Sequence, residues 1–178
     1  MNDPVAHFAM LEANLEDLNA RVADLPITGF LLCRLIQHLG RETAALLEQQ
    51  IRPSGLAEAE FRVLTALFSQ PDGVAHPSDL CARALQSPAN MSRISDALVS
   101  RDLITRVLSA HDRRRMVLHI TLQGEEMVRR LLPKLSAPVR ALLADFTEAE
   151  QRQWIAKLKL LGTKLDEAKS NELPGPAA

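Results

Sequence analysis

The sequence has few of the residues that cross-link small secreted proteins or hold metal ions. Its 178 residues include only two cysteines, Cys33 and Cys81, which lie far apart in the chain. Their spacing gives neither a disulfide framework nor a CxxC metal-ligand pair. The histidines, His38 and His119 among them, are scattered without a shared metal-ligand spacing. We therefore expect reduced thiols, no metal site and no cofactor.

Long apolar runs are also missing. No stretch approaches the roughly 18 apolar residues that a membrane-spanning helix needs, and 24% of the residues are charged. The N-terminus carries Asp3 and lacks the basic start, apolar block and small-residue cleavage site of a secretory signal. The sequence therefore predicts a soluble, cytoplasmic protein, and its 47% of apolar residues are enough for a sizeable core.

The net charge of -1 at first disfavours a nucleic-acid partner, because duplex DNA attracts proteins through lysine and arginine. Residues 77–121, however, contain seven arginines and four acidic residues, a net charge of +3, whereas the rest of the chain has a net charge of -4. A basic middle between acidic flanks is typical of a DNA-reading module attached to a scaffold with other tasks.

Apolar residues at helical spacing predict a series of helices before the middle of the chain. A stripe from Phe8 to Leu18 predicts an N-terminal helix that ends before Pro26. Ser87 and Pro88 form a clear helix start, because a serine side chain caps free N–H groups and the fixed φ of proline fits the first turn. The helices predicted after the N-terminal one cover residues 28–50, 57–68, 78–84 and 88–101.

Two short strands and two further helices are predicted in the second half. Alternating residues at 104–108 and 116–120 predict a hairpin with a polar, basic tip. Thr121 can cap a helix running toward Leu143, which Pro133 and Pro138 should bend or interrupt because each removes a backbone donor.

The C-terminal part begins with a capping-box pattern. Thr147 and Glu150 have the spacing of that box and open a last helix that continues through Leu165. The tail from Ser170 onward is predicted to be disordered.

The order of these elements points to a winged helix-turn-helix in a mainly α (α+β) fold. Two short helices surround a tight turn, the second is polar on its outer face, and a basic hairpin follows directly. Such a helix fits the major groove of B-DNA, and arginines at a hairpin tip can enter the minor groove. The predicted base-reading residues are Ser87, Ala89, Asn90, Ser92 and Arg93, the wing residues are Asp112, Arg113, Arg114 and Arg115, and the phosphate contacts are Ser78, Arg101 and Arg106.

The residues of the predicted wing resemble the signature of a known protein family. Asp112-Arg113-Arg114 followed by Leu118, Thr121 and Gly124 resembles the wing signature of the MarR family, D-x-R followed by L-x-L-T-x-x-G. Within that family the chain is most similar to the multidrug-efflux repressor branch. The motifs that carry the likeness upstream of the wing are Pro77-Ser78-Asp79-Leu80, Asn90, Ser92-Arg93-Ile94 and Arg101-Asp102-Leu103-Ile104.

The resemblance implies a homodimer, an operator with two-fold symmetry, and a cleft for a small lipophilic or aromatic anionic inducer. It assigns the wing arginine to Arg114 and its bracing acid to Asp112. The implied organisation is an N-terminal helical extension (1–26), a helical dimerisation region (27–52 and 122–168), a winged helix-turn-helix (53–121) and a disordered tail (169–178). The chain departs from the family at Asp102, where glycine is common, and at Ser109-Ala110, which lacks a further acid-basic pair.

Two rival functions differ in what Cys33 and the arginines do. The position of Cys33 resembles that of the reactive cysteine in oxidant-sensing members of the family. Those sensors also depend on nearby tyrosines, and this chain contains no tyrosine. A thiol peroxidase is disfavoured because no acid-base constellation accompanies Cys33, so we expect no enzyme. A winged helix that binds proteins without DNA is the other rival. The candidate ligand pocket is Phe30, Arg34, His38 and Phe61, although an apolar stripe is more often core.

Overall fold

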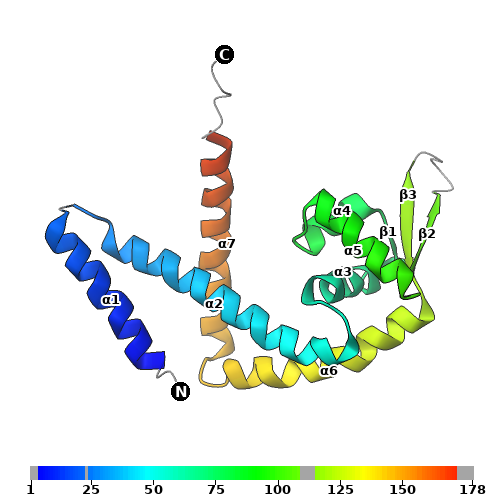
Figure 1. Ribbon diagram of the computed structural model, residues 1–178, viewed down its shortest axis with the longest axis horizontal. Coiled ribbons are helices and arrows are strands. Elements are labelled where there is room, and N and C mark those ends of the chain that lie inside the picture. The colour runs from blue at the N-terminus through cyan, green and yellow to red at the C-terminus, as the bar shows by residue number, and fades with distance from the viewer. Residues whose placement is uncertain (1–3, 23, 109–114, 172–178) are drawn as a thin grey trace, which may run out of the picture. The chain divides into compact units, whose positions relative to one another are not determined.

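The computed structural model describes residues 4–22, 24–108 and 115–171. The chain is mainly helical, with a three-stranded antiparallel sheet, which confirms the predicted fold class. The elements in chain order are α1 (Pro4–Arg21), α2 (Ile27–Ile51), the 3-10 turn η1 (Arg52–Ser54), α3 (Glu58–Phe68), the 3-10 turn η2 (Pro71–Gly73), β1 (Val74–Ala75), α4 (Pro77–Arg83), α5 (Pro88–Ser100), β2 (Ile104–Leu108), β3 (Met116–Ile120), α6 (Leu122–Leu142) and α7 (Glu148–Asn171) (Figure 1).

The chain divides into two compact units, residues 1–135 and 136–178. The first unit holds the sheet and the helices up to α5, and the second holds α7. Among the described residues, no helix combines the length and the apolar character that crossing a bilayer requires.

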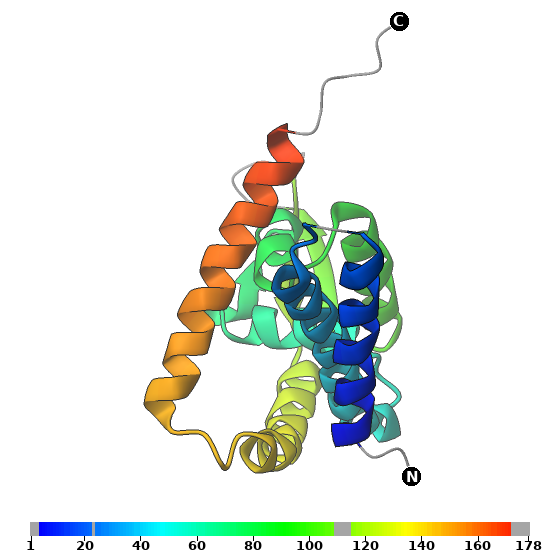
Figure 2. The ribbon, with the colours of Figure 1, turned by 90° about the vertical axis from the view of Figure 1, so that its left-hand side faces the viewer.

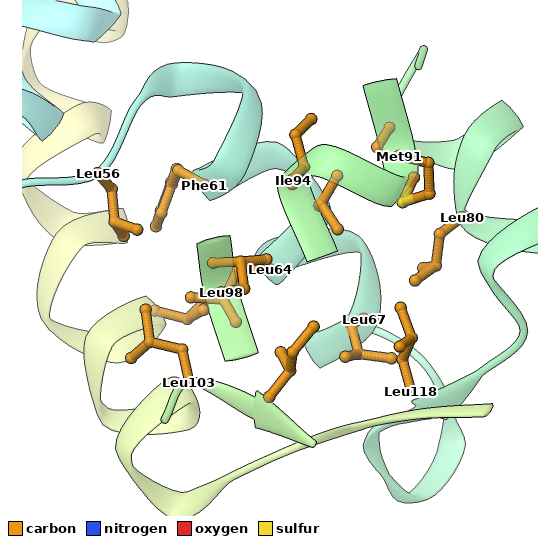
Figure 3. Packing of buried hydrophobic residues seen from close by; sticks show 14 of the residues in the cluster. Leu56, Phe61, Leu64, Leu67, Leu80, Met91, Ile94, Leu98, Leu103 and Leu118 are labelled. Carbon is orange, nitrogen blue, oxygen red and sulfur yellow. The ribbon is translucent and has the colours of Figure 1, made fainter. Parts of the chain in front are cut away.

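The main core lies where α3, α4 and α5 pack against the sheet and the first half of α6 (Figure 3). Its side chains follow the apolar stripes of these helices, with positions three or four apart turned inward. Leu64, Ile94 and Leu98 are fully buried at its centre. The other members labelled in the figure are Leu56, Phe61, Leu67, Leu80, Met91, Leu103 and Leu118. This core holds α5 in place and leaves its opposite face to solvent.

The sheet has the strand order β1-β3-β2 and a regular register. Val107 pairs with Val117 and Arg106 pairs with Leu118 across the β2–β3 hairpin. Because side chains alternate along a strand, Leu118 enters the core while Val117 lies on the other face. Strand β1 escaped the sequence analysis, since two residues are too short to show an alternation.

One tight joint connects the end of α5, the start of the wing and the start of α6. Thr121 Oγ1 donates to Asp102 O at 2.7 Å and accepts from Gly124 N at 3.0 Å, as the predicted cap of this helix. Asp102 has a φ of 56°, a left-handed conformation that aspartate tolerates and glycine adopts freely. This conformation explains why glycine is common at this position in the family that the sequence resembles. A Cβ on Gly124 would overlap Leu103 O, so this position requires glycine.

The helix α6 corrects one prediction. It runs without interruption from Leu122 to Leu142 through both Pro133 and Pro138, so of the two predicted alternatives, a bend or an interruption, the interruption is wrong. The prolines free the carbonyl groups of Arg129 and Lys134, and these residues are exposed, so water can bond to them.

The helices at the two ends of the chain also follow the predicted pattern. Helix α1 packs along α2, with Leu15 only 2% exposed and the Phe8 ring 5.7 Å from the His38 ring, edge to face (Figure 2). The predicted capping box opens α7, where Thr147 N donates to Glu150 Oε2 at 2.7 Å. Helix α7 reaches Asn171 and so includes Ser170, where the disordered tail was predicted to begin; residues 172–178 lie outside the described part of the chain.

Candidate nucleic-acid interface

Helix α5 presents a polar face because its other face is fixed in the core. Ser87 caps the helix as predicted, since its hydroxyl accepts from Asn90 N at 3.2 Å, and Pro88 occupies the first turn. Met91 anchors the same turn and is 1% exposed. The side chains that point away from this anchor are exposed, and they include Ala89, Ser92 and Arg93.

The outer face of α5 carries a hydrogen-bonded chain of polar groups. Asn90 Oδ1 accepts from Arg93 Nη2 at 2.9 Å and from Arg93 Nε at 3.3 Å. The amide nitrogen of Asn90 donates to Gln86 Oε1 in the preceding loop. The structure thus brings the two predicted readers Asn90 and Arg93 together and adds Gln86, which the sequence analysis did not single out. Guanidinium and carboxamide groups are the side chains that bind guanine and adenine edges with two hydrogen bonds.

Arg106 connects the wing to α5. Its guanidinium forms an ion pair with Asp96 and donates to Ser92 O at 3.2 Å. Among the described residues, Asp96 forms its ion pair with Arg106 and not with Arg93. The Arg106 side chain is 30% exposed, so this contact fixes the first wing strand relative to the helix at the surface.

The side chain of Arg101, the C-cap of α5, forms hydrogen bonds with another part of the protein. Its guanidinium donates to Ser54 O at 2.8 Å and to Gly55 O, the carbonyl groups that end η1. Two oriented hydrogen bonds of a charged donor make Arg101 a clamp between the end of α5 and the turn after α2. The sequence analysis predicted a phosphate contact for Arg101, and the described geometry shows hydrogen bonds within the protein instead.

The remaining predicted contacts lie at the edges of this surface. Ser78 is exposed in the first turn of α4, where its hydroxyl donates to Asp79 at 3.3 Å. Arg115 is exposed directly before β3. The other wing residues, Asp112, Arg113 and Arg114, lie outside the described residues.

A pocket of about 490 Å³ lies between α4, α5 and the hairpin. Its walls are mostly apolar, with Met91 and Met116 among them, and Ser92 and Arg106 supply polar groups. Cys81 also lines it and packs against the main core. The pocket therefore adjoins the Arg106–Asp96 pair that holds the hairpin to α5.

The predicted ligand residues are not gathered in one place. Phe61 is 4% exposed in the main core, Phe30 is 45% exposed in α2, and His38 faces Phe8 of α1. Arg34 lines a shallow hollow beside α1. Phe61 thus behaves as the core residue that its helical stripe favoured. Cys33, the candidate redox residue, is exposed in α2.

Helices α4 and α5, the sheet behind them and the polar outer face of α5 define a winged helix-turn-helix protein. Residues 54–115 match the family model described as MarR family. This match confirms the resemblance to the MarR family that the motifs of the winged-helix region led us to expect.

Similar proteins extend this relationship over most of the chain. The chain is 29% identical over 160 residues to the transcriptional repressor MprA of Escherichia coli (strain K12), covering 90% of this chain and 91% of that protein. It is 23% identical over 117 residues to the HTH-type transcriptional repressor YetL of Bacillus subtilis (strain 168), covering 66% of this chain and 68% of that protein.

Solved structures confirm the fold. AbsC, a MarR family transcriptional regulator from Streptomyces coelicolor, is 24% identical, and the match covers 80% of this chain and 97% of that chain with a TM-score of 0.73. S. aureus MepR in its DNA complex is 18% identical, with 74% and 96% covered and a TM-score of 0.68. The prediction of a DNA-binding transcriptional regulator, rather than an enzyme, is confirmed at the level of class.

Proposed function

We propose that the protein is a homodimeric repressor that binds an operator with two-fold symmetry and releases it when a small molecule binds. The observation that carries this proposal is the exposed polar face of α5, built from Asn90, Ser92 and Arg93 on a helix whose other face is locked in the core. A helix presented in this way can enter a major groove, with Arg93 donating to guanine and Asn90 pairing with adenine.

The wing supplies the second contact. Arg106 fixes β2 to α5 through Asp96, so the hairpin and the reading helix meet DNA as one body. We assign the arginines at 113–115 to the adjacent minor groove, whose negative potential favours guanidinium groups. In this arrangement Ser78 lies on the helix that precedes α5, where a hydroxyl can donate to a phosphate oxygen.

A second copy of the chain completes the proposed binding unit. Apolar side chains of α7 are exposed, among them Ile155 at 51%, Leu158 at 54% and Leu165 at 55%. An amphipathic helix with an uncovered apolar stripe requires a partner to bury it. We propose that residues 27–52 and 122–168 form the dimer and residues 53–121 bind DNA. The two reading helices then lie about 34 Å apart, one turn of B-DNA.

Release of DNA by a ligand is the third part of the proposal. The pocket between α4, α5 and the hairpin adjoins the Arg106–Asp96 pair. An anionic ligand there can compete with Asp96 for Arg106 and favour a hairpin position that no longer matches the groove. A ligand acts in this way only through its preference for one of the two states. The MprA relative is named a repressor and MepR a regulator of a multidrug efflux pump, which supports an efflux or stress-response operon in the cytoplasm as the target.

Exposure of Cys33 favours a second candidate, regulation by oxidants. Under this alternative, peroxide releases DNA from the native protein and fails to release it from Cys33→Ser. Under the main proposal both proteins respond to a ligand and neither responds to peroxide.

Gel-shift titration with the region upstream of the gene tests the main proposal. Arg93→Ala should weaken operator binding by roughly 1–3 kcal/mol and relax the preference for one base pair. Arg152→Ala is the matched control, because this exposed arginine lies on α7 and pairs with Glu148. A protein-interaction module without DNA would show no specific complex with either protein. Equal losses in both variants would contradict reading by α5.

A further inference from the structure

The hydrogen bonds on the outer face of α5 begin at a backbone carbonyl group in the preceding loop. Gln86 lies between α4 and α5, where its backbone N–H donates to Cys81 O at 2.8 Å and its Nε2 donates to Ala84 O at 3.1 Å. Ala84 is only 1% exposed, so this carbonyl group belongs to the buried frame of the loop. Because a carbonyl oxygen only accepts, the bond to Ala84 O fixes Nε2 on that side of the Gln86 carboxamide. The oxygen Oε1 of Gln86 then points toward α5.

The same orientation is passed on to Asn90 and from there to Arg93. Gln86 Oε1 accepts from Asn90 Nδ2, so the oxygen of the Asn90 carboxamide faces Arg93. That oxygen accepts from Arg93 Nη2 at 2.9 Å and from Arg93 Nε at 3.3 Å. A guanidinium only donates, so it agrees with this orientation of Asn90 and opposes the flipped one. The three side chains thus form a relay, from Gln86 through Asn90 to Arg93, whose direction is set at both ends.

The relay occupies one edge of the Arg93 guanidinium and leaves another edge free. Nε and Nη2 form the side edge, which faces Asn90 Oδ1. Nη1 and Nη2 form the end edge, which carries two parallel N–H donors. Among the described residues, Nη1 of Arg93 has no hydrogen-bond partner, and the side chain is exposed. Two parallel donors match the O6 and N7 acceptors of guanine, whereas adenine has a donor at N6 in place of O6.

We infer that Gln86 is a positioning residue for sequence reading, and that the relay presents the end edge of Arg93 to a guanine in the major groove. Arg93 contacts the base, and Gln86 and Asn90 act through it. An arginine side chain that is held in place before it meets DNA loses less conformational entropy on binding than a free one. The inference rests on the proposed function, because it names the base that α5 reads.

The relay also limits what Asn90 can offer to DNA. Pairing with adenine requires the oxygen and the nitrogen of the same carboxamide. The oxygen of Asn90 already accepts two hydrogen bonds from Arg93, which is its full number, and its nitrogen donates to Gln86. An adenine contact by Asn90 therefore breaks the relay, whereas a guanine contact by Arg93 leaves it intact. This difference favours guanine as the base that the two residues read together.

Selection of bound duplexes from a random-sequence library by the full-length protein tests the inference, with the base frequency at each position as the readout. Gln86→Leu removes the acceptor for Asn90 and should lower the preference for guanine over adenine at one position of each half-site at least fivefold. Gln86→Glu keeps an acceptor there, because both carboxylate oxygens accept, and should keep that preference within twofold of the native value. Its negative charge should weaken binding to all sequences alike.

Two further variants separate positioning from a general defect of the fold. Gln123→Leu is the matched control, because this exposed glutamine of α6 lies outside the relay and donates to Arg101 O at 3.4 Å. It should leave every base preference unchanged. Arg93→Lys removes the side edge that Asn90 holds, so adding Gln86→Leu to it should not alter the base preferences further. A defect of the fold would instead lower affinity for every duplex in both backgrounds and keep the order of the bases.

The outcomes distinguish the inference from the proposed function. An unchanged guanine preference in Gln86→Leu would overturn the inference, as would its loss in both Gln86→Leu and Gln86→Glu. The inference also fails if Asn90→Ala changes the preference at an adenine position and leaves the guanine position as it was, because Asn90 then reads its own base. If the native protein selects a symmetric motif that does not depend on Gln86, the proposed function stands and only the inference is lost. If the native protein selects no motif, the proposed function itself fails.

Discussion

The winged-helix region buries its apolar side chains in its own core, whereas helix α7 leaves its apolar side chains exposed. In the winged-helix region, leucines of every helix and of the sheet meet in one core, and Leu64, Leu80 and Leu98 are fully buried. In α7, every side chain from Arg152 to Ser170 is exposed, including Trp154 and five leucine or isoleucine residues. The first region satisfies its own hydrophobic surface, and α7 does not.

This difference suggests different roles for the two regions under the proposed function, DNA reading for the winged-helix region and dimerisation for α7. A region with a complete core can hold the polar face of α5 rigidly, as a base-reading surface requires. A helix with an uncovered stripe gains its stability from another surface, and in the proposed dimer a second copy of the chain supplies that surface. Under the proposed function, one copy of the chain holds a complete reading surface, whereas the spacing between the two reading helices of a dimer depends on the contact that α7 makes.

The largest expected effect comes from adding charge to α7. Leu158→Glu combined with Leu161→Glu should convert the dimer to monomer, because each buried leucine contributes roughly 1.5–3 kcal/mol and a buried charge adds to the loss. Sedimentation velocity measures the change. Leu85→Glu, at an exposed leucine of the winged-helix region, should leave the dimer intact. A double variant that stays dimeric would remove α7 from the interface.

The next effect separates two glycines. Gly124→Ala should destabilise the fold by about 3 kcal/mol, because the new methyl group would overlap Leu103 O and lie 2.8 Å from Ile120 Cγ1. Gly162→Ala in α7 meets no heavy atom within 4 Å and should gain roughly 0.5–1 kcal/mol from helix propensity. Urea unfolding measures both. Equal stabilities of the two variants would contradict the tight joint after the wing.

A smaller loss is expected at Arg101. Arg101→Ala removes the hydrogen bonds to Ser54 O and Gly55 O and should cost about 2 kcal/mol, the range for bonds that involve a charged donor. Urea unfolding of the protein without DNA detects this loss. Arg83→Ala, at an exposed arginine without a described ion pair, serves as the control and should change stability by less than about 0.5 kcal/mol. If Arg101→Ala weakens DNA binding and leaves stability unchanged, Arg101 is a phosphate contact instead of a clamp.

The smallest effect concerns the start of α7. Hydrogen bonds from the Thr147 hydroxyl and backbone N–H hold the pKa of Glu150 below its ordinary value of 4.5. A lowered carboxyl pKa stabilises the helix above the ordinary value, and that contribution disappears as the pH falls through the lowered pKa. Thr147→Ala should destabilise the protein more at pH 7 than at pH 3, because protonation of Glu150 weakens the hydrogen bonds that the variant also loses. Circular dichroism of urea unfolding at both values checks this, with Thr163→Ala as the control.

The sequence was a good guide wherever the signal is local. The helices of the winged-helix region, both hairpin strands, the Ser87 cap and the Thr147 capping box were all predictable, because each depends on residues at most four apart. The resemblance at Thr121 and Gly124 has a physical basis in the joint with Leu103, where only glycine fits. Phe61 in the core followed from its helical stripe.

Contacts between distant residues gave no such signal. Arg106 and Asp96 are ten residues apart on different elements, and His76 and Met116 are forty apart, so only the fold brings them together. The same holds for Arg101 and the η1 carbonyl groups. The prolines of α6 suggested an interruption that the helix does not have. A missing backbone N–H donor is tolerated there because the carbonyl groups it leaves free are exposed to water. The pocket between α4, α5 and the hairpin could not be found from apolar stripes, since its walls combine these three elements.

The central claim is that the polar face of α5 reads DNA from two symmetric copies. Selection of bound fragments from genomic DNA by the purified native protein, with Arg93→Ala in parallel, tests it most directly. The account predicts an inverted repeat whose half-sites are centred about 10 base pairs apart for the native protein, and a degenerate motif for Arg93→Ala. Fragments without any shared sequence, or the same motif for both proteins, would contradict it.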